Sequence, residues 1–139
     1  MINRPIEYEF FLPANVLPKE FVYPETYVRY IHSNFPNLEP WNFFYNHLKY
    51  RFNGLKERYP KRSIVPFARR KDNDDVACFE AKEPSENPRV IIIHDWASEG
   101  WENRGEYDDF LEWVQLAKEE AEEWKEFWKN YDEKSQAVE

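Results

Sequence analysis

The densest cluster of side chains that could do chemistry is the run Asp72, Asn73, Asp74 and Asp75. Carboxylate and amide oxygens are the ligands that hard cations prefer, and a metal-dependent hydrolase would need such a set beside a base. A calcium loop of the EF-hand type, however, requires glycine at its sixth position, which here is Ala77. Asp and Asn side chains also form tight turns by bonding their own backbone. We therefore predict a fold-defining acidic turn at these four residues and no metal site.

The three histidines, His32, His47 and His94, lack the spacing of a zinc site. His94 and Asp95 end a predicted strand, where catalytic residues often lie, but no nucleophile accompanies them. Cys78 lies within an apolar run, where a thiol usually behaves as a small hydrophobic side chain. The three glycines are too scattered for a phosphate-binding loop. These observations predict a protein with no catalytic residues and no cofactor.

Two tryptophans, Trp96 and Trp101, flank a Ser-Glu-Gly turn and are followed by Glu102. An indole on a loop can anchor a partner protein, because tryptophan is enriched in binding hot spots. An indole at such a position can also cover the end of a hydrophobic core. Both interpretations remain open at the level of the sequence.

Charge is divided unevenly along the chain, which has 19 basic and 27 acidic side chains and a formal net charge of -8. Residues 1–70 hold 11 basic and 6 acidic side chains, whereas residues 71–139 hold 8 and 21. The basic stretch 49–71 could contact phosphates, or it could face the acidic segment within the fold or simply be solvated. We favour the second interpretation because no nucleic-acid-binding motif accompanies the stretch. The acidic segment 95–126 is either a surface that attracts a basic partner or a solvated helix face.

The composition predicts one globular domain. A chain of 139 residues with 42% hydrophobic and 19% aromatic residues can bury a substantial core. A single cysteine forms no internal disulfide, so the cytoplasm is the expected compartment. Neither a signal peptide nor a membrane span of roughly 20 apolar residues is expected. We predict a domain over residues 1–132 and a frayed polar tail at 133–139.

The N-terminal half predicts one strand and two helices. Apolar and polar residues alternate over residues 6–12, as in a short strand. A proline opens an apolar series at helical spacing over residues 24–35. The aromatic run from residue 41 to about residue 52 or 55 is predicted to form a largely buried helix.

The C-terminal half predicts three sequential antiparallel strands and a long helix. Short apolar runs at 63–67, 76–81 and 89–95 are separated by turn residues. The third run does not alternate, which is typical of a central strand covered on both faces. Pro66 has no N–H to donate, so the first strand should lie at an edge or be bulged there. Apolar residues at steps of three and four over 107–131 predict an amphipathic helix.

Three segments of the chain resemble the bacterial SUKH superfamily: SIVPFARRKDNDDVACFEA (63–81), RVIIIHDWASEGWE (89–102) and EYDDFLEWVQLA (106–117). The resemblance covers roughly residues 60–117, and the first 59 residues match only loosely. It implies an α+β fold in which helices pack around a mostly antiparallel sheet, the class that the order of the elements also predicts. It further implies an immunity protein, since bacterial members commonly neutralise a cognate polymorphic toxin, often a nuclease.

The leading hypothesis is therefore a cytoplasmic, non-catalytic immunity protein that binds a protein partner, with a basic toxin domain as the candidate. The expected contact residues are Asp95, Trp96, Glu99, Trp101, Glu102, Glu119 and Glu123. The alternative is a regulatory or scaffold module without a toxin partner. A metal-dependent hydrolase built on residues 72–75 with His94 is less favoured. We expect no small-molecule substrate, no direct nucleic-acid binding and no membrane association.

Overall fold

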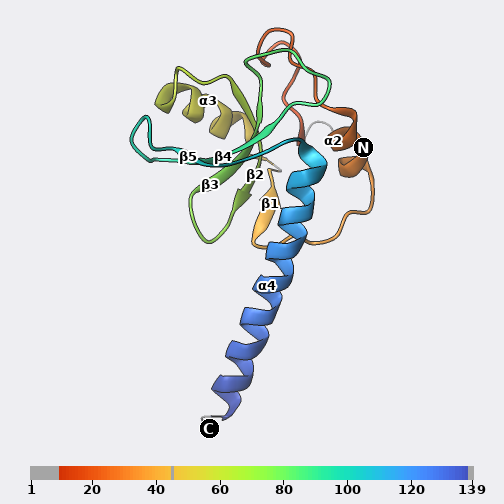
Figure 1. The fold of residues 1–139 in the computed structure, drawn as a ribbon, viewed down its shortest axis with the longest axis vertical. Coiled ribbons are helices and arrows are strands. Elements are labelled where there is room, and N and C mark those ends of the chain that lie inside the picture. The colour runs from red at the N-terminus through yellow and green to blue at the C-terminus, as the bar shows by residue number, and fades with distance from the viewer. Residues whose placement is uncertain (1–9, 45, 138–139) are drawn as a thin grey trace, which may run out of the picture.

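The computed structural model describes residues 10–44 and 46–137, which contain a five-stranded antiparallel sheet and three helices (Figure 1). Each strand pairs with the next strand along the chain, so the sheet order is β1-β2-β3-β4-β5. This is the α+β class predicted from the sequence. In chain order the elements are α2 (Glu25–His32), β1 (Trp41–Phe43), α3 (Leu48–Arg58), β2 (Ile64–Arg70), β3 (Asp75–Glu80), β4 (Val90–His94), β5 (Asn103–Tyr107) and α4 (Phe110–Ala137).

The three predicted strands form the centre of the sheet. In β4, four of the five residues are buried, so this strand is central and covered on both faces as predicted. The pairing of β2 with β3 shifts register between Pro66 and Ala68, which is the bulge expected at a proline. β2 is not an edge strand, because β1 pairs with it along Ala68 to Arg70.

Both edge strands differ from the sequence prediction. The aromatic run predicted as one helix from residue 41 is divided into β1 and α3. The segment from Asn103 to Tyr107, predicted as the approach to the last helix, is β5. β1 is only three residues long, and β5 is mostly polar and exposed, so neither strand has a hydrophobic pattern long enough to predict it.

The first helix confirms the prediction for residues 24–35 except at its end, since α2 stops at His32. Residues 6–9 of the predicted N-terminal strand lie outside the described residues. Residues 10–12 do not form a strand, and the N–H of Leu12 donates to the Tyr23 hydroxyl at 2.8 Å.

An aromatic cluster joins one face of the sheet to helices α2 and α4. The rings of Phe67 and Phe79 stack with centroids 4.4 Å apart, and Trp113 meets Phe67 edge-on at 4.9 Å. Tyr27 of α2 lies 5.3 Å from Phe110 of α4. All five side chains are almost completely buried. The cluster therefore fixes both helices on the same face (Figure 1).

The other face of the sheet is covered by α3, which Figure 1 shows on the opposite side from α2 and α4. Its buried residues are Leu48, Phe52 and Leu55. Alternation along β3 points Val76 and Cys78 toward this face, and both are buried. Burial raises the pKa of the Cys78 thiol well above its ordinary value. Cys78 thus behaves as the small hydrophobic side chain that its sequence context predicted.

Helix α4 extends well beyond the sheet (Figure 1). Its buried residues are Phe110, Trp113, Val114, Ala117 and Ala121. The helix continues to Ala137 without a break at Asp132, and residues 138–139 of the predicted frayed tail lie outside the described residues. Among the residues that the structure describes, no helix combines the length and the apolar character needed to cross a bilayer.

Candidate protein-binding site

The loop between β4 and β5, residues 95–102, is here called the tryptophan loop. Two of its residues have positive φ angles, Trp96 at 71° and Gly100 at 99°. Glycine adopts this left-handed conformation at little cost, but a bulky residue does so rarely. The conformation of Trp96 therefore needs support from its neighbours.

Asp95 supplies part of that support from inside the protein. Its carboxylate, 1% exposed, accepts two hydrogen bonds from Arg58, at 2.6 Å from Nε and 2.7 Å from NH2. Arg51 donates a third at 3.3 Å, and the Trp96 N–H donates a fourth at 2.9 Å. Asp95, predicted as a contact residue, is therefore placed inside the protein as a structural anchor of the tryptophan loop and not on its accessible surface.

Glu102 anchors the other end of the tryptophan loop. It is 4% exposed and accepts hydrogen bonds from Arg62 Nε at 2.5 Å and from the Gly100 N–H at 2.6 Å. Burial alone would raise the pKa of this carboxyl, but the hydrogen bonds from Arg62 and the backbone outweigh it and lower the pKa. Glu102, also predicted as a contact residue, is thus a second buried anchor of the tryptophan loop.

Helix α3 and the segment directly after it hold the tryptophan loop in place. The hydroxyl of Tyr59, directly after α3, donates to the Ala97 carbonyl at 2.8 Å. Because Arg51, Arg58 and Arg62 come from the same part of the chain, one element and its extension fix both ends of the loop.

The solvent-facing part of the tryptophan loop consists mainly of its two indoles. Trp101 is 81% exposed and Trp96 is 67% exposed. The ring of Trp96 lies over the Arg58 guanidinium, 3.8 Å from its carbon, and so covers the ion pair with Asp95. Glu99 is exposed and lies 3.8 Å from Lys61. Trp96, Glu99 and Trp101 are therefore accessible, as a contact role requires.

The remaining predicted contact residues, Glu119 and Glu123, lie on a different element. Both are exposed on α4. Figure 1 shows the β4–β5 connection beside α3, away from α4. The structure thus divides the predicted acidic surface into two separate places.

The acidic turn before β3 makes local contacts. Asp72 accepts two hydrogen bonds from Arg70, at 2.8 and 3.0 Å, and the hydrogen bond from Arg70 chiefly lowers the pKa of Asp72. The Asn73 side chain accepts the N–H of Asp75 at 2.8 Å, as the turn prediction required. Asp75 lies 2.8 Å from His94 Nδ1. In the described part of the chain, no group of three or more His, Cys, Asp or Glu side chains is arranged to hold a metal ion.

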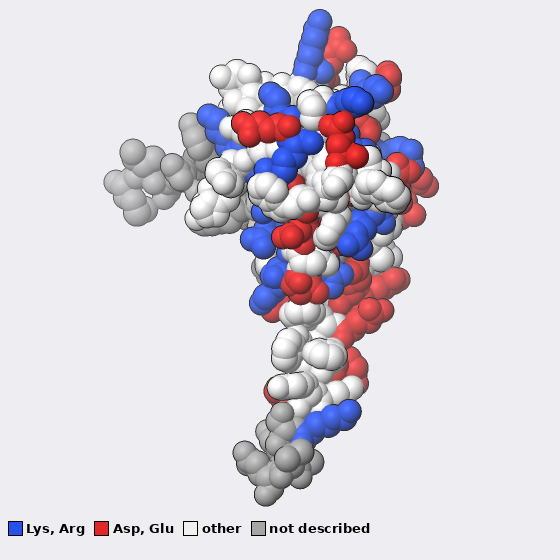
Figure 2. Space-filling model, turned by 90° about the vertical axis from the view of Figure 1, so that its left-hand side faces the viewer, with Lys and Arg blue, Asp and Glu red and all other residues white. Residues whose placement is uncertain are grey.

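The basic stretch 49–71 largely faces acids within the fold. Arg51 and Arg58 pair with Asp95, Arg62 pairs with Glu102, and Arg70 pairs with Glu120 of α4. Figure 2 accordingly shows basic and acidic side chains interleaved over the body of the molecule. The structure agrees with the favoured interpretation of this stretch.

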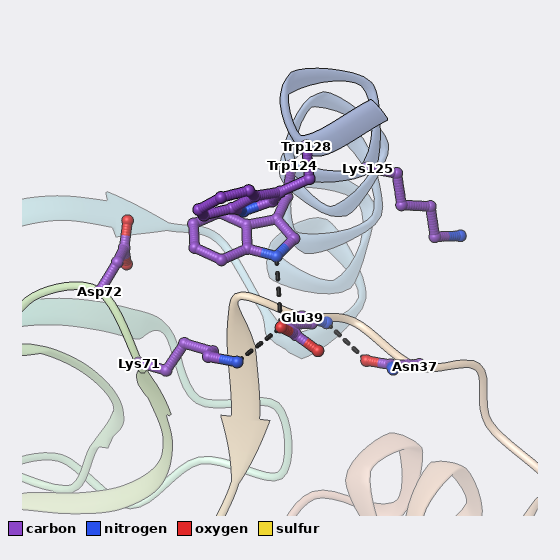
Figure 3. A pocket seen from close by; sticks show the side chains of 7 residues that line it. All are labelled: Asn37, Glu39, Lys71, Asp72, Trp124, Lys125 and Trp128. Carbon is purple, nitrogen blue, oxygen red and sulfur yellow. Dashed lines mark hydrogen bonds and ion pairs between the residues drawn. The ribbon is translucent and has the colours of Figure 1, made fainter. Parts of the chain in front are cut away.

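A surface groove of about 470 Å³ lies where α4 leaves the sheet, between the indoles of Trp124 and Trp128 and the side chains of Glu39 and Lys71 (Figure 3). The Trp124 indole N–H donates to Glu39 Oε1 at 3.3 Å, and Lys71 Nζ donates to the same oxygen at 2.6 Å. The sequence pattern predicted only that these tryptophans lie on the apolar face of an amphipathic helix, so it did not predict the groove.

The arginines that hold the tryptophan loop were also missed as site residues, because an arginine is identified as an anchor only when its acidic partner is known. Comparisons of the chain with protein-family models, with curated proteins and with solved structures found no match. The SUKH resemblance therefore stays a prediction, and the site must be interpreted from its own geometry.

Proposed function

We propose that this chain is a non-catalytic, cytoplasmic protein-binding module that presents the tryptophan loop to a partner protein. The observation that carries the proposal is the pair of exposed indoles on a loop fixed by two buried ion pairs. A contact surface that is already ordered before binding loses little conformational entropy on association. Exposed aromatic anchors on such a surface are typical of binding hot spots.

The backbone at Trp96 supports the same proposal. A bulky residue with φ of 71° costs about 1–3 kcal/mol, and such strain tends to persist at functional sites. The core gains little from the Trp96 side chain, which is mostly exposed. Trp101 contributes still less to the interior, so its large apolar ring is the stronger candidate for the anchor.

Following the resemblance to the SUKH superfamily, we propose that the partner is a toxin and that the module acts as an immunity protein. The regulatory or scaffold module is the competing function. A toxin-type reading frame beside the coding gene, and inhibition of the encoded toxin by an equimolar amount of this protein, support the immunity role. A partner with no toxic activity supports the scaffold role.

Affinity purification from the native cell tests the proposed site. Wild type, Trp101→Ala and Trp96→Ala are compared, with Val22→Ala as a matched control because Val22 is equally an exposed apolar residue outside the loop. We expect Trp101→Ala to weaken capture by at least about tenfold, a change of roughly 1.4 kcal/mol, and Val22→Ala to leave capture unchanged. Equal capture by wild type and Trp101→Ala would exclude the tryptophan loop as the site.

A further inference from the structure

The second half of α4 presents an aromatic face that the body of the protein does not cover. Residues 122–137, here called the protruding segment, follow Ala121, after which no side chain described as far as Lys134 is buried, and they span about 24 Å at 1.5 Å per residue. Phe127 is 57% exposed, Tyr131 is 55% exposed and Trp128 is 42% exposed. Contiguous exposed apolar surface of this kind marks an interaction site.

The aromatic side chains of the protruding segment form one continuous row. The ring centroids of Trp124 and Trp128 are 5.8 Å apart, and those of Trp128 and Tyr131 are 5.5 Å apart. Phe127 lies 5.2 Å from Trp128 and widens the row. Figure 2 shows uncharged side chains gathered along this part of the helix, with acidic side chains beside them.

The row continues the face that packs on the sheet. Steps of four and three lead from Val114, Ala117 and Ala121, which are buried, to Trp124, Trp128 and Tyr131. This alternation of four and three is the a and d spacing of a coiled coil, in which the a and d face is covered by another helix. In the first half of α4 the sheet covers this face, and among the described residues the wall of the groove at Glu39 and Lys71 covers it only partly in the protruding segment, where Trp128 stays 42% exposed and Tyr131 55% exposed.

We propose that the protruding segment pairs antiparallel with the same segment of a second copy of this chain. The sheet blocks the a and d face as far as Ala121, so a second helix has room only along residues 122–137. An antiparallel pair that overlaps over this window has its twofold axis between residues 129 and 130. The two bodies then lie at opposite ends of the pair and do not collide.

Charge complementarity favours a second copy over an unrelated helix. In this register Trp128 is level with Tyr131 of the second copy, and Lys125 lies on the same flank of the seam as Asp132 of the second copy, offset from it by about 3 Å along the axis, each pair occurring twice. Lys125 and Asp132 are exposed, and each follows a residue of the aromatic row, which places it at the flank of the seam. Lys125 lies 3.5 Å from Glu122 in an exposed pair within the helix, which holds it only weakly. In a parallel pair, Lys125 and Asp132 would instead lie about 10 Å apart along the axis.

Sedimentation equilibrium of the full chain tests the proposal. We expect wild type to form dimers at a protein concentration of about 100 μM, a range in which weak self-association is measurable. The double variant Trp128→Glu with Tyr131→Glu should be monomeric and keep the wild-type circular dichroism. Leu111→Glu is the control, because Leu111 is an exposed apolar residue of the same helix outside the row, and it should leave the dimer unchanged.

Exchanging the charges of Lys125 and Asp132 tests the register of the helix pair and tests whether the second helix is another copy of this chain. Lys125→Glu or Asp132→Lys alone turns two attractive pairs into repulsive ones, so each should weaken the dimer about tenfold. The variant that carries both changes restores opposite charges and should dimerise within about threefold of wild type. Monomeric wild type, a dimer unaffected by the aromatic double variant, or failure of the combined exchange to restore dimers would each overturn the proposal.

Discussion

The guanidinium of Arg58 is the group on which the tryptophan loop depends most. One edge donates two hydrogen bonds to Asp95, and one face carries the ring of Trp96. The hydrogen bond to Asp95 chiefly raises the pKa of Arg58 above its ordinary value. Gly54, one turn earlier in α3, leaves room for this arrangement, because a Cβ there would lie 2.7 Å from Arg58 NH2. The position of the Trp96 indole therefore depends on the buried carboxylate of Asp95 and on the absence of a side chain at Gly54.

Asp95→Ala should lower the free energy of unfolding by about 3 kcal/mol. The change removes the carboxylate and leaves the mostly buried Arg58 and Arg51 without their partner, which is far more costly than losing a surface pair. Glu99→Ala, which breaks the exposed pair with Lys61, is the control and should change stability by less than about 0.5 kcal/mol. Urea denaturation measures both. Equal effects of the two variants would contradict the anchor role of Asp95.

Gly54→Ala should not stabilise the protein, although alanine in place of glycine usually stabilises a helix by about 1 kcal/mol. The new methyl group would meet the Arg58 guanidinium, which the ion pair with Asp95 holds in place. Asn53→Ala, at the exposed neighbouring position, is the control and should give the ordinary gain of a few tenths of a kcal/mol. Thermal unfolding of the two variants measures the difference. A full stabilisation by Gly54→Ala would show that Arg58 is free to move.

Glu102 should make stability depend on pH in the acid range. Its pKa is lower in the folded protein than the ordinary value of 4.5, so its contribution is complete above pH 4.5. The contribution disappears as the pH falls from 4.5 through the folded pKa, because the folded state then has to take up the proton. Glu102→Gln should therefore be less stable than wild type at pH 7, with the gap narrowing below pH 4.5. A gap that stays constant in urea denaturation from neutral to acid pH would contradict this assignment.

At the scale of elements, α4 is one helix with two environments. Its first half closes the aromatic core, and its second half extends past the sheet into solvent (Figure 1). The amphipathic pattern is the same in both halves, since apolar residues recur at steps of three and four throughout. The apolar face of α4 is buried as far as Ala121 and largely exposed after it, because the helix extends past the sheet beyond this residue.

Replacing either of two phenylalanines of α4 by alanine tests the difference between these environments through the loss of stability. Phe110→Ala should cost about 3–5 kcal/mol of stability, because Phe110 is completely buried. Phe127→Ala should cost less than about 0.5 kcal/mol in the monomer, because its side chain is mostly exposed. Both are measured by urea denaturation at low protein concentration. A comparable loss in Phe127→Ala would mean that the protruding segment is packed in the monomer.

At the scale of the whole molecule, the tryptophan loop and the protruding segment lie on opposite sides of a meander sheet. The loop rests on α3, and the protruding segment leaves the face that carries α2 and α4 (Figure 1). They share no residue, so partner binding and self-association should be independent, as expected for distant sites. Trp101→Ala should leave the dimer unchanged, and Trp128→Glu with Tyr131→Glu should leave partner capture unchanged. Loss of both properties in either variant would contradict this independence.

The hydrophobic pattern of the sequence was sufficient to predict the α+β class, the three central strands, the bulge at Pro66 and the long last helix. These features follow from local periodicity and from the backbone chemistry of proline, both of which are visible in a single sequence. The edge strand β1 was missed because it is only three residues long within an aromatic run, and β5 was missed because it is mostly polar and exposed. The aromatic run at 41–55 similarly gave no sign of where its strand ends and its helix begins.

The sequence by itself determined which residue types gather in the tryptophan loop and along the last helix. Only the tertiary structure decided which of them face solvent. Asp95 and Glu102 are buried because arginines more than 35 residues earlier in the chain reach them, and ion pairs between distant segments leave no local pattern. Trp101 and Trp128 are exposed because the loop and the helix extend beyond the area that the sheet can cover.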